Sequence, residues 1–161
     1  MIWTYTNELR QACVEQAEWP LAYNNWPKEL LKETNCLAFS LGLTLPNMDY
    51  DGLVSINPEF PVPRFSEVFE RLLTELNLEW RKIDSPMEAT CEEYVLQIYG
   101  FYRLFRDYHP DFHVIRRELD GTWVHKPDDK KSPCVINFDE FVKEYPASEI
   151  SGTYAVRKKA R

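Results

Sequence analysis

Apolar positions in the first half of the chain recur at helical spacing. This spacing predicts three helices, over residues 6–18, 36–43 and 67–76. Trp19-Pro20 ends the first helix, because the residue before a proline disfavours helical geometry. Thr34-Asn35 is a good N-cap for the second helix, and Ser66 caps the third. Between the second and third helices, residues 46–63 are rich in Pro, Asn, Asp and Gly and indicate a long surface loop.

In the second half the spacing changes to that of strands. Strands are predicted over residues 80–83, 94–105, 111–117 and 122–126, with an edge strand over 154–157. His109-Pro110 is expected to turn the chain before the strand at 111–117. Asn137 caps a short helix predicted over residues 138–145. Helices followed by an antiparallel sheet indicate an α+β fold.

The bulk properties indicate one soluble domain spanning residues 1–161. The chain has 161 residues, of which 44% are hydrophobic and 28% charged, enough for a core of its own. A net charge of −7 argues against broad binding to nucleic acid, and the basic residues 157–161 are interpreted as a solubilising tail. No stretch has the length of a membrane span and residues 1–11 lack a signal pattern, so we expect a cytoplasmic protein that does not act on membranes.

Cys36 differs from the other three cysteines in its neighbours. The four cysteines, none in a C-x-x-C pair, are Cys13, Cys36, Cys91 and Cys134. Cys36 opens a predicted helix, where free amides and the helix dipole favour an anion and lower the pKa of a thiol. A thiolate is the reactive form in nucleophilic catalysis, and the amide of Cys36 is suited to stabilise an oxyanion. The alternative is a buried cysteine that only packs at a helix start.

Two of the three histidines lie on strands joined by a short turn. His113 is on one predicted strand, His125 is on the next, and residues 119–121 lie between them. A two-residue turn would point the imidazoles to opposite faces of the sheet. A three-residue loop with Gly121 in the left-handed conformation would place them on one face as diagonal neighbours, and Gly at the third position favours it. The sequence thus permits a relay of thiolate, general base and orienting imidazole; the alternative is that His125 is a partly exposed strand residue.

Two stretches of the chain resemble known sequences. Residues 35–41 are similar to the N-C-x-A-Y-x-L stretch of a group of short, mostly uncharacterised phage and bacterial proteins. Residues 111–127 resemble that group's D-F-H-x-x-R…D-G-x-W-x-H-K-P block. More broadly, a Cys at a helix start, a His on a strand and a polar residue on the next strand resemble the NlpC/P60 branch of the papain-like cysteine peptidases. In that branch the third residue is often His, which matches His125.

The resemblance implies a papain-like, NlpC/P60-like fold, with N-terminal helices packed on an antiparallel sheet. It also implies a hydrolase, a thiol protease or amidase, that cleaves a peptide or isopeptide bond or transfers its acyl group through a thioester. Cys36 would attack, His113 would move the proton and His125 would orient His113. The implied candidates for oxyanion or substrate binding are Tyr23, Asn35 and Trp123.

The chain also departs from these families. Leu37 and Ala38 stand where peptidoglycan peptidases usually have Ser-Gly after the cysteine, which puts a peptidoglycan substrate in doubt. Asp128 stands where the short phage and bacterial group usually has Gly. Asp111, which shares a strand face with His113, and Asp128 are alternative third members of the site. Alternation also predicts that one of Arg116 and Arg117 is exposed, while the other pairs with an acid.

Two further alternatives remain open at this level. A zinc site built from Cys36, His113, His125 and Cys134 would lack the close ligand pairs typical of structural zinc, so no metal or cofactor is expected. The chain could instead be a catalytically inactive papain-like scaffold that binds a protein partner, such as a phage-encoded inhibitor of a host system. The expected partner is a peptide or protein substrate in the first hypothesis and a bound protein in the second.

Overall fold

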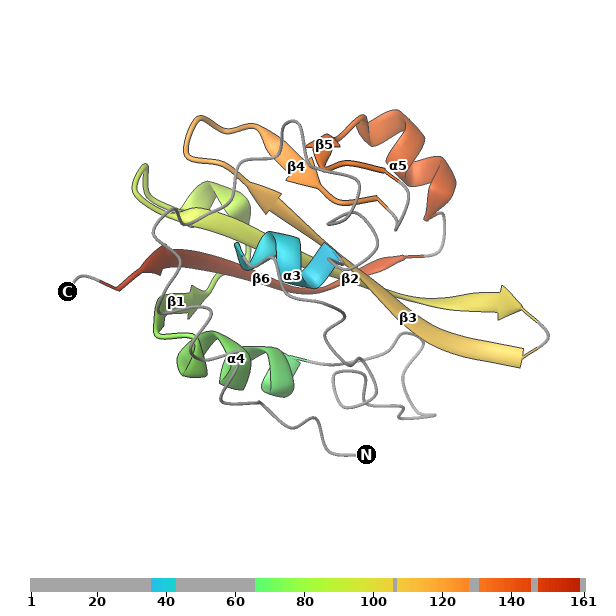
Figure 1. Ribbon diagram of the computed structural model, residues 1–161, viewed down its shortest axis with the longest axis horizontal. Coiled ribbons are helices and arrows are strands. Elements are labelled where there is room, and N and C mark those ends of the chain that lie inside the picture. Colours follow the sequence, from blue (N-terminus) through green and yellow to red (C-terminus); the bar gives the residue numbers. More distant parts are fainter. Residues whose placement is uncertain (1–35, 43–65, 106, 128–130, 146–147, 160–161) are drawn as a thin grey trace.

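The protein has an α+β fold built on one six-stranded antiparallel sheet, with strand order β1-β6-β2-β3-β4-β5 (Figure 1). The computed structural model describes residues 36–42, 66–105, 107–127, 131–145 and 148–159. Its helical elements are α3 (Cys36–Ser40), α4 (Ser66–Glu75), the 3-10 helix η1 (Pro86–Glu88) and α5 (Phe138–Glu144). Its strands are β1 (Leu78–Lys82), β2 (Tyr94–Phe105), β3 (Asp107–Arg117), β4 (Trp123–His125), β5 (Cys134–Val135) and β6 (Glu149–Lys158).

β2 and β3 form the long hairpin at the centre of the sheet. β2 has the predicted bounds, but β3 begins at Asp107 and runs straight through Pro110, so the turn predicted at His109-Pro110 is wrong. Backbone groups along β3 point alternately toward β2 and away from it. Pro110 falls on the same alternate positions as Val114 and Arg116, whose backbone groups point away from β2. A proline at such a position removes no hydrogen bond from the β2–β3 ladder, which is why the strand tolerates it.

β6 is a central strand rather than the predicted edge strand. It pairs with β1 on one side and with β2 on the other. Tyr154, Ala155 and Val156 are all fully buried, so side chains on both faces of β6 are covered. A continuous buried run is typical of an interior strand, whereas an edge strand open to water usually alternates.

The β3–β4 connection is the predicted three-residue loop. The amide of Glu118 donates to the carbonyl of Thr122 at 2.8 Å, so these two residues close the hairpin. Gly121 has a φ of +91°, a conformation that side-chain-bearing residues rarely adopt. The side chain of Asp120 accepts from the Thr122 amide at 2.9 Å and fixes the turn.

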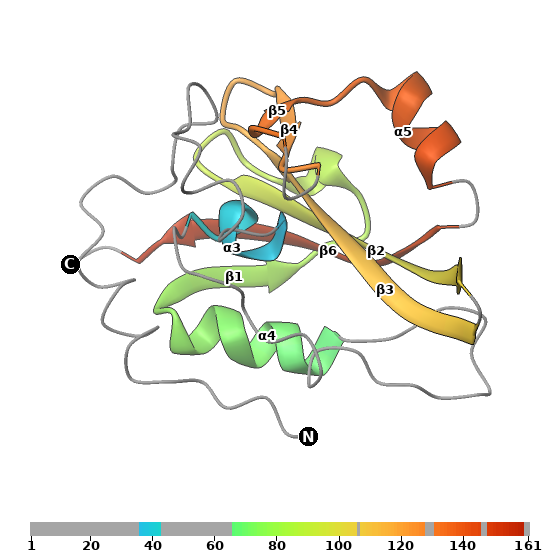
Figure 2. The ribbon, with the colours of Figure 1, turned by 45° about the vertical axis from the view of Figure 1, so that its right-hand side comes forward.

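Helices cover the two faces of the sheet with different side chains. On one face, α3 and α4 contribute to a buried group that we call the α4-side cluster: Leu37, Ala38, Leu41, Phe69, Leu72, Leu73, Leu76, Leu78, Leu96, Ile98, Phe112, Val114, Tyr154 and Val156. On the other face, α5 contributes to the α5-side cluster: Phe101, Ile115, Ile136, Phe141 and Tyr145. Figure 2 shows α3 and α4 well separated from α5, which follows β5. No helix in the described ranges is long and apolar enough to cross a membrane.

Candidate active site

A buried pair of histidines lies on the α5 face of β3 and β4. Nε2 of His113 and Nδ1 of His125 are 2.8 Å apart, and one of the two nitrogens donates the proton that the other accepts. The residues are only 3% and 7% exposed. His125 lies beyond the pair Arg116–Val124, so it is a diagonal neighbour of His113 on one face, which confirms the geometry predicted from the turn.

Aromatic rings from α5 and from Tyr145, the residue that ends it, pack against the histidine pair. Tyr145 stacks on His113 with ring centroids 5.0 Å apart and planes at 17°, and Phe141 lies 5.8 Å from His113 and 6.1 Å from His125. α5 begins at the predicted cap, because Oδ1 of Asn137 accepts from the amides of Asp139 and Glu140. Burial in these surroundings, together with the positive charge of Lys131, lowers the pKa of His125 to about 4. His125 is therefore neutral at pH 7.

Cys36 is the first residue of α3 and lies at the edge of β3. Its sulfur accepts hydrogen bonding from the backbone of Val114, and Oγ of Ser40 donates to the Val114 carbonyl at 3.2 Å. Both outward backbone groups of Val114 therefore meet α3. In the described part of the chain β4 pairs with β3 only at Arg116 and Arg117, so α3 takes over the strand edge where β4 is not paired. The sulfur thus lies at the backbone position next to His113.

The pKa of Cys36 shifts in the direction opposite to the prediction. Burial raises the pKa to about 11, and the negative charge of Asp111 adds to that increase. Hydrogen bonding from the backbone of Val114 and Leu37, and the charge of Lys126, act in the other direction but do not prevail. The predicted lowering is wrong because α3 has only five residues and most of the side chain is withdrawn from water. The resting thiol is therefore protonated at neutral pH.

Cys36 and the histidine pair approach β3 from different sides. Cys36 packs against the α4-side cluster, whereas the His113 ring lies with Tyr145 and Phe141 on the α5 face. The structure thus brings His113 and His125 together, and it sets Cys36 at the strand edge between the two faces. To contact each other, the sulfur of Cys36 and the ring of His113 would have to meet at the edge of β3 near Val114.

The remaining predicted site residues have varied positions. Trp123 is half-buried on the α5 face, where its ring meets Phe138 at 6.3 Å, so it packs beneath α5. Asp111 is half-buried, its Oδ1 accepts from the amide of Phe112 at 2.7 Å, and its charge acts on Cys36. Nε2 of His113 contacts Nδ1 of His125. Three predicted residues lie outside the described residues: Tyr23, Asn35 and Asp128.

The zinc alternative is wrong for the described residues. Cys36, His113, His125 and Cys134 are all described, yet no three His, Cys, Asp or Glu side chains in the described ranges form a group that could hold a metal ion. Cys134 pairs with His125 across β4 and β5 and is exposed, whereas Cys36 lies at the edge of β3 next to α3.

Sequence reasoning missed the roles of Arg116 and Tyr145. Arg116 is completely buried and its Nη2 lies 2.8 Å from Oε1 of Glu118, which agrees with the prediction that one of the two arginines pairs with an acid. Alternation along β3 could have indicated that Arg116 is on the buried α3 side. Tyr145 was predicted only as the end of a helix, and no sequence signal placed its ring on His113.

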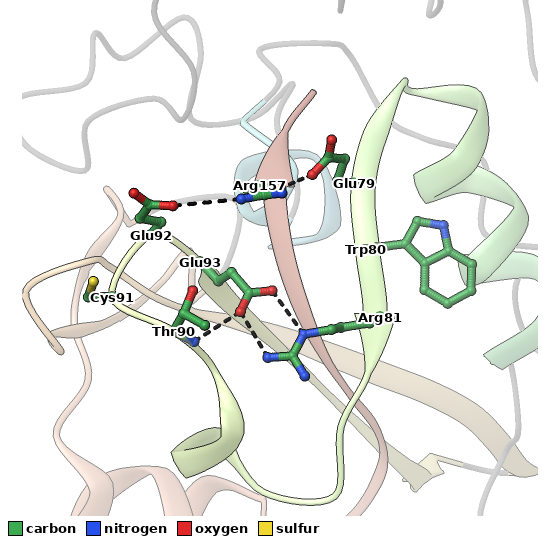
Figure 3. A pocket seen from close by; sticks show the side chains of 8 residues that line it. All are labelled: Glu79, Trp80, Arg81, Thr90, Cys91, Glu92, Glu93 and Arg157. Carbon is green, nitrogen blue, oxygen red and sulfur yellow. Dashed lines mark hydrogen bonds and ion pairs between the residues drawn. The ribbon is translucent and has the colours of Figure 1, made fainter. Parts of the chain in front are cut away.

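A pocket of about 450 Å³ lies elsewhere on the molecule (Figure 3). Its lining comes from β1, β6 and the segment before β2, and includes none of α3, β3 or β4. The charged side chains that line it pair with one another: Arg81 with Glu93 at 2.9 Å, and Arg157 with Glu79 and, at 3.7 Å, with Glu92. The pocket is therefore separate from the histidine pair.

Comparisons with known proteins yield no relatives: no family model matches the chain, and no curated protein or solved structure matches it either.

Proposed function

We propose that the protein is a papain-like, thiol-dependent hydrolase or acyl transferase that acts on an amide bond of a peptide or protein. The buried contact between His113 Nε2 and His125 Nδ1 carries the proposal. Cys36 lies beside Val114, the residue that follows His113 on the same strand. The motif resemblance of residues 35–41 and 111–127 supports the same assignment and a cytoplasmic, phage-related setting.

The proposed reaction proceeds through a thioester on Cys36. His113 takes the thiol proton while Sγ attacks the carbonyl carbon, and the resulting oxyanion is stabilised by backbone amides at the start of α3. His113 then gives the proton to the leaving amine as the C–N bond breaks. Water completes a hydrolysis, and a second amine completes a transfer. His125 remains neutral and holds the imidazole ring in one orientation.

The raised pKa of Cys36 determines which form of the site is at rest. A thiol with a pKa of about 11 carries little thiolate at pH 7, so Cys36 rests as the neutral thiol. Proton transfer to His113 must then accompany the attack, rather than precede it. Cys36 is expected to react quickly only when His113 can act as its base.

Alkylation of individual cysteines tests the proposal without a known substrate. Iodoacetamide at pH 7, read by mass spectrometry, should modify Cys36 faster than the exposed thiols Cys91 and Cys134. His113→Ala should remove this advantage, because the base is lost. Cys91→Ala is the matched control and should leave the Cys36 rate unchanged. A Cys36 rate below that of Cys91, insensitive to His113→Ala, contradicts the proposal.

Turnover provides the second arm of this experiment. Cys36→Ala should abolish release of a fluorogenic amine from a panel of peptidyl amides while the circular dichroism spectrum stays unchanged. Cys91→Ala should retain full turnover. Equal turnover in both variants would show that Cys36 is not the nucleophile.

A second candidate function is favoured by the raised pKa of Cys36. A papain-like scaffold without catalysis, which binds a protein partner, needs no activated thiol. In that case Cys36→Ala retains the biological activity, and partner capture from infected or producing cells depends on surface residues rather than on His113.

A further inference from the structure

Arg116 connects β3 to α3 from within the core. Its side chain is completely buried, and Nη1 donates to the carbonyl of Phe39 at 2.8 Å. The guanidinium carbon lies 4.5 Å from the centre of the Phe39 ring. At its other side, Nε donates to Oε1 of Glu118 at 2.8 Å. One guanidinium thus binds an acid on its own chain segment and a carbonyl of α3.

α3 depends on such contacts because it is too short to be stable alone. It has five residues, and its last turn closes with the amide of Gly42 bonded to the Phe39 carbonyl at 2.9 Å. Two polar contacts join it to β3: Arg116 to Phe39, and Ser40 to the Val114 carbonyl. Cys36 lies at the opposite end of the same short helix. The position of its sulfur therefore follows from where these contacts fix the helix.

Burying the guanidinium of Arg116 in the core costs free energy. Burial opposes the charged form of Arg116, and the negative charge of Glu118 compensates for part of that cost. A methionine or leucine would occupy similar volume without it. The planar fork of arginine can bind two acceptors in fixed directions, which neither methionine nor leucine can do.

We infer that Arg116 is a positioning residue for Cys36: its bond to the Phe39 carbonyl sets α3 against β3 and so holds the sulfur at the backbone of Val114, the residue that follows His113. This inference rests on the proposed function, since it assigns Arg116 to the same site. Arg116 itself does not touch the reacting atoms.

Loss of this contact should change reactivity and turnover in opposite directions. In Arg116→Met, α3 is no longer fixed at Phe39, so Cys36 gains access to water and its pKa moves back toward that of an ordinary thiol. Direct alkylation of Cys36 by the thiolate at pH 9 should then be several-fold faster than in the wild type. Amide turnover should fall about 10²-fold, because a misplaced nucleophile loses its orientation. Both readouts are compared only in variants whose circular dichroism spectra and unfolding midpoints match those of the wild type, because unfolding alone would also expose Cys36 and lower turnover.

The matched control is Arg81→Met. Arg81 also binds a carboxylate and a backbone carbonyl, through Glu93 at 2.9 Å and the Glu88 carbonyl at 2.7 Å, but it does so at the surface beside the separate pocket (Figure 3). This variant should leave the Cys36 alkylation rate and turnover at wild-type values. Cys91, which is exposed, serves as the internal reference thiol in every sample.

Arg116→Lys keeps the inference testable if Arg116→Met does not fold. A lysine retains the charge near Glu118 but cannot bind the acid and the Phe39 carbonyl with one rigid fork. It should show the same opposite changes at smaller size, with turnover reduced about tenfold. Unchanged pH 9 alkylation of Cys36 in the folded variants overturns the positioning role. Absence of turnover in the wild type overturns the proposed function alone, because the alkylation readout still reports the position of Cys36.

Discussion

The two faces of the sheet carry different chemistry. The α4-side cluster is formed by aliphatic and aromatic side chains of α3, α4 and four strands. The α5 face holds the histidine pair and a second polar contact, in which the Tyr99 hydroxyl donates to Oε1 of Gln97 at 3.1 Å. The first face therefore contributes stability through packing, whereas the second couples its packing to the protonation of buried groups.

This difference predicts which perturbations each face will resist. The α4-side cluster is apolar and its packing does not depend on pH, so substitutions within this cluster should act mainly through lost volume. The buried imidazole of His125 has a lowered pKa and stays neutral at pH 7, so the α5 side should respond to acid as well as to lost contacts. The edge of β3 at Val114, where Cys36 lies, is the point at which the two faces meet.

The largest effect on stability should come from truncating one phenylalanine side chain on the α4 side. Phe69→Ala removes a ring that is 1% exposed and lies 5.2 Å from the Tyr154 ring, and it should cost about 3–5 kcal/mol of unfolding free energy. Phe138→Ala makes the same change on α5, where the residue is 42% exposed, and should cost about 1 kcal/mol. Urea denaturation of both variants measures the difference. Equal costs would show that burial of the ring does not determine the cost at these two positions.

Acid should destabilise the α5 face selectively. The folded pKa of His125 is about 4 against an ordinary value of 6.5, so the unfolded chain binds more protons between these values. The stability is full above about pH 6.5 and falls as the pH drops toward 4, by roughly 3 kcal/mol in total. His125→Gln should flatten this part of the curve. Arg81 lowers the pKa of the Glu93 carboxyl from 4.5 to about 2, so its contribution to stability is lost only as the pH falls from about 4.5 to 2, and the upper part of the window reports on His125. A wild-type curve that is flat from pH 6.5 to 4.5 contradicts the prediction.

Removing the stacked ring on His113 should have a smaller effect. Tyr145→Leu keeps an apolar side chain at a position 7% exposed but loses the stacking, and should cost about 1–2 kcal/mol. Tyr145→Phe retains the ring and is the control. Chemical denaturation at pH 7 gives both values, and a cost for Tyr145→Leu no greater than for Tyr145→Phe would remove stacking as the cause.

The smallest effect on stability is expected for a substitution on the solvent-exposed side of α5. Val142 lies on α5 with 63% of its surface exposed, so Val142→Lys should change the unfolding free energy by no more than about 0.5 kcal/mol. Thermal unfolding of this variant should superimpose on that of the wild type. A clear loss of stability would mean that this side of α5 is covered in the folded protein.

The sequence was sufficient where one local signal determined the structure. Asn137 predicted the start of α5, and the position of Gly121 predicted the three-residue loop that sets His113 beside His125. These features depend on the conformations of a few neighbouring residues, which the residue types at those positions predict. The α+β class followed from the same reasoning, because the change of hydrophobic spacing is a local property too.

The parts that sequence reasoning got wrong depend on distant partners. Pro110 was interpreted as part of a turn because a proline inside a strand usually removes a backbone hydrogen bond. Only the pairing of β3 with β2 shows that the missing amide would have faced away from β2. β6 read as an edge because its two neighbours, β1 and β2, lie far back in the chain. The pKa of Cys36 depends on burial against β3 rather than on its place in the helix. Spacing along the chain carries none of these relations.

The central position of β6 has a consequence for the growing chain on the ribosome. β6 is the last of the described strands to be synthesised, yet it is the partner that joins β1 to β2. Until it emerges, β1 and the adjoining edge of β2 lack the strand that pairs with them in the finished sheet, and unpaired edges recruit other strands. A product cut short before Glu149 would expose both edges. Assembly of the complete sheet therefore waits until β6 has been translated, and termination before β6 should yield aggregates rather than a smaller folded protein.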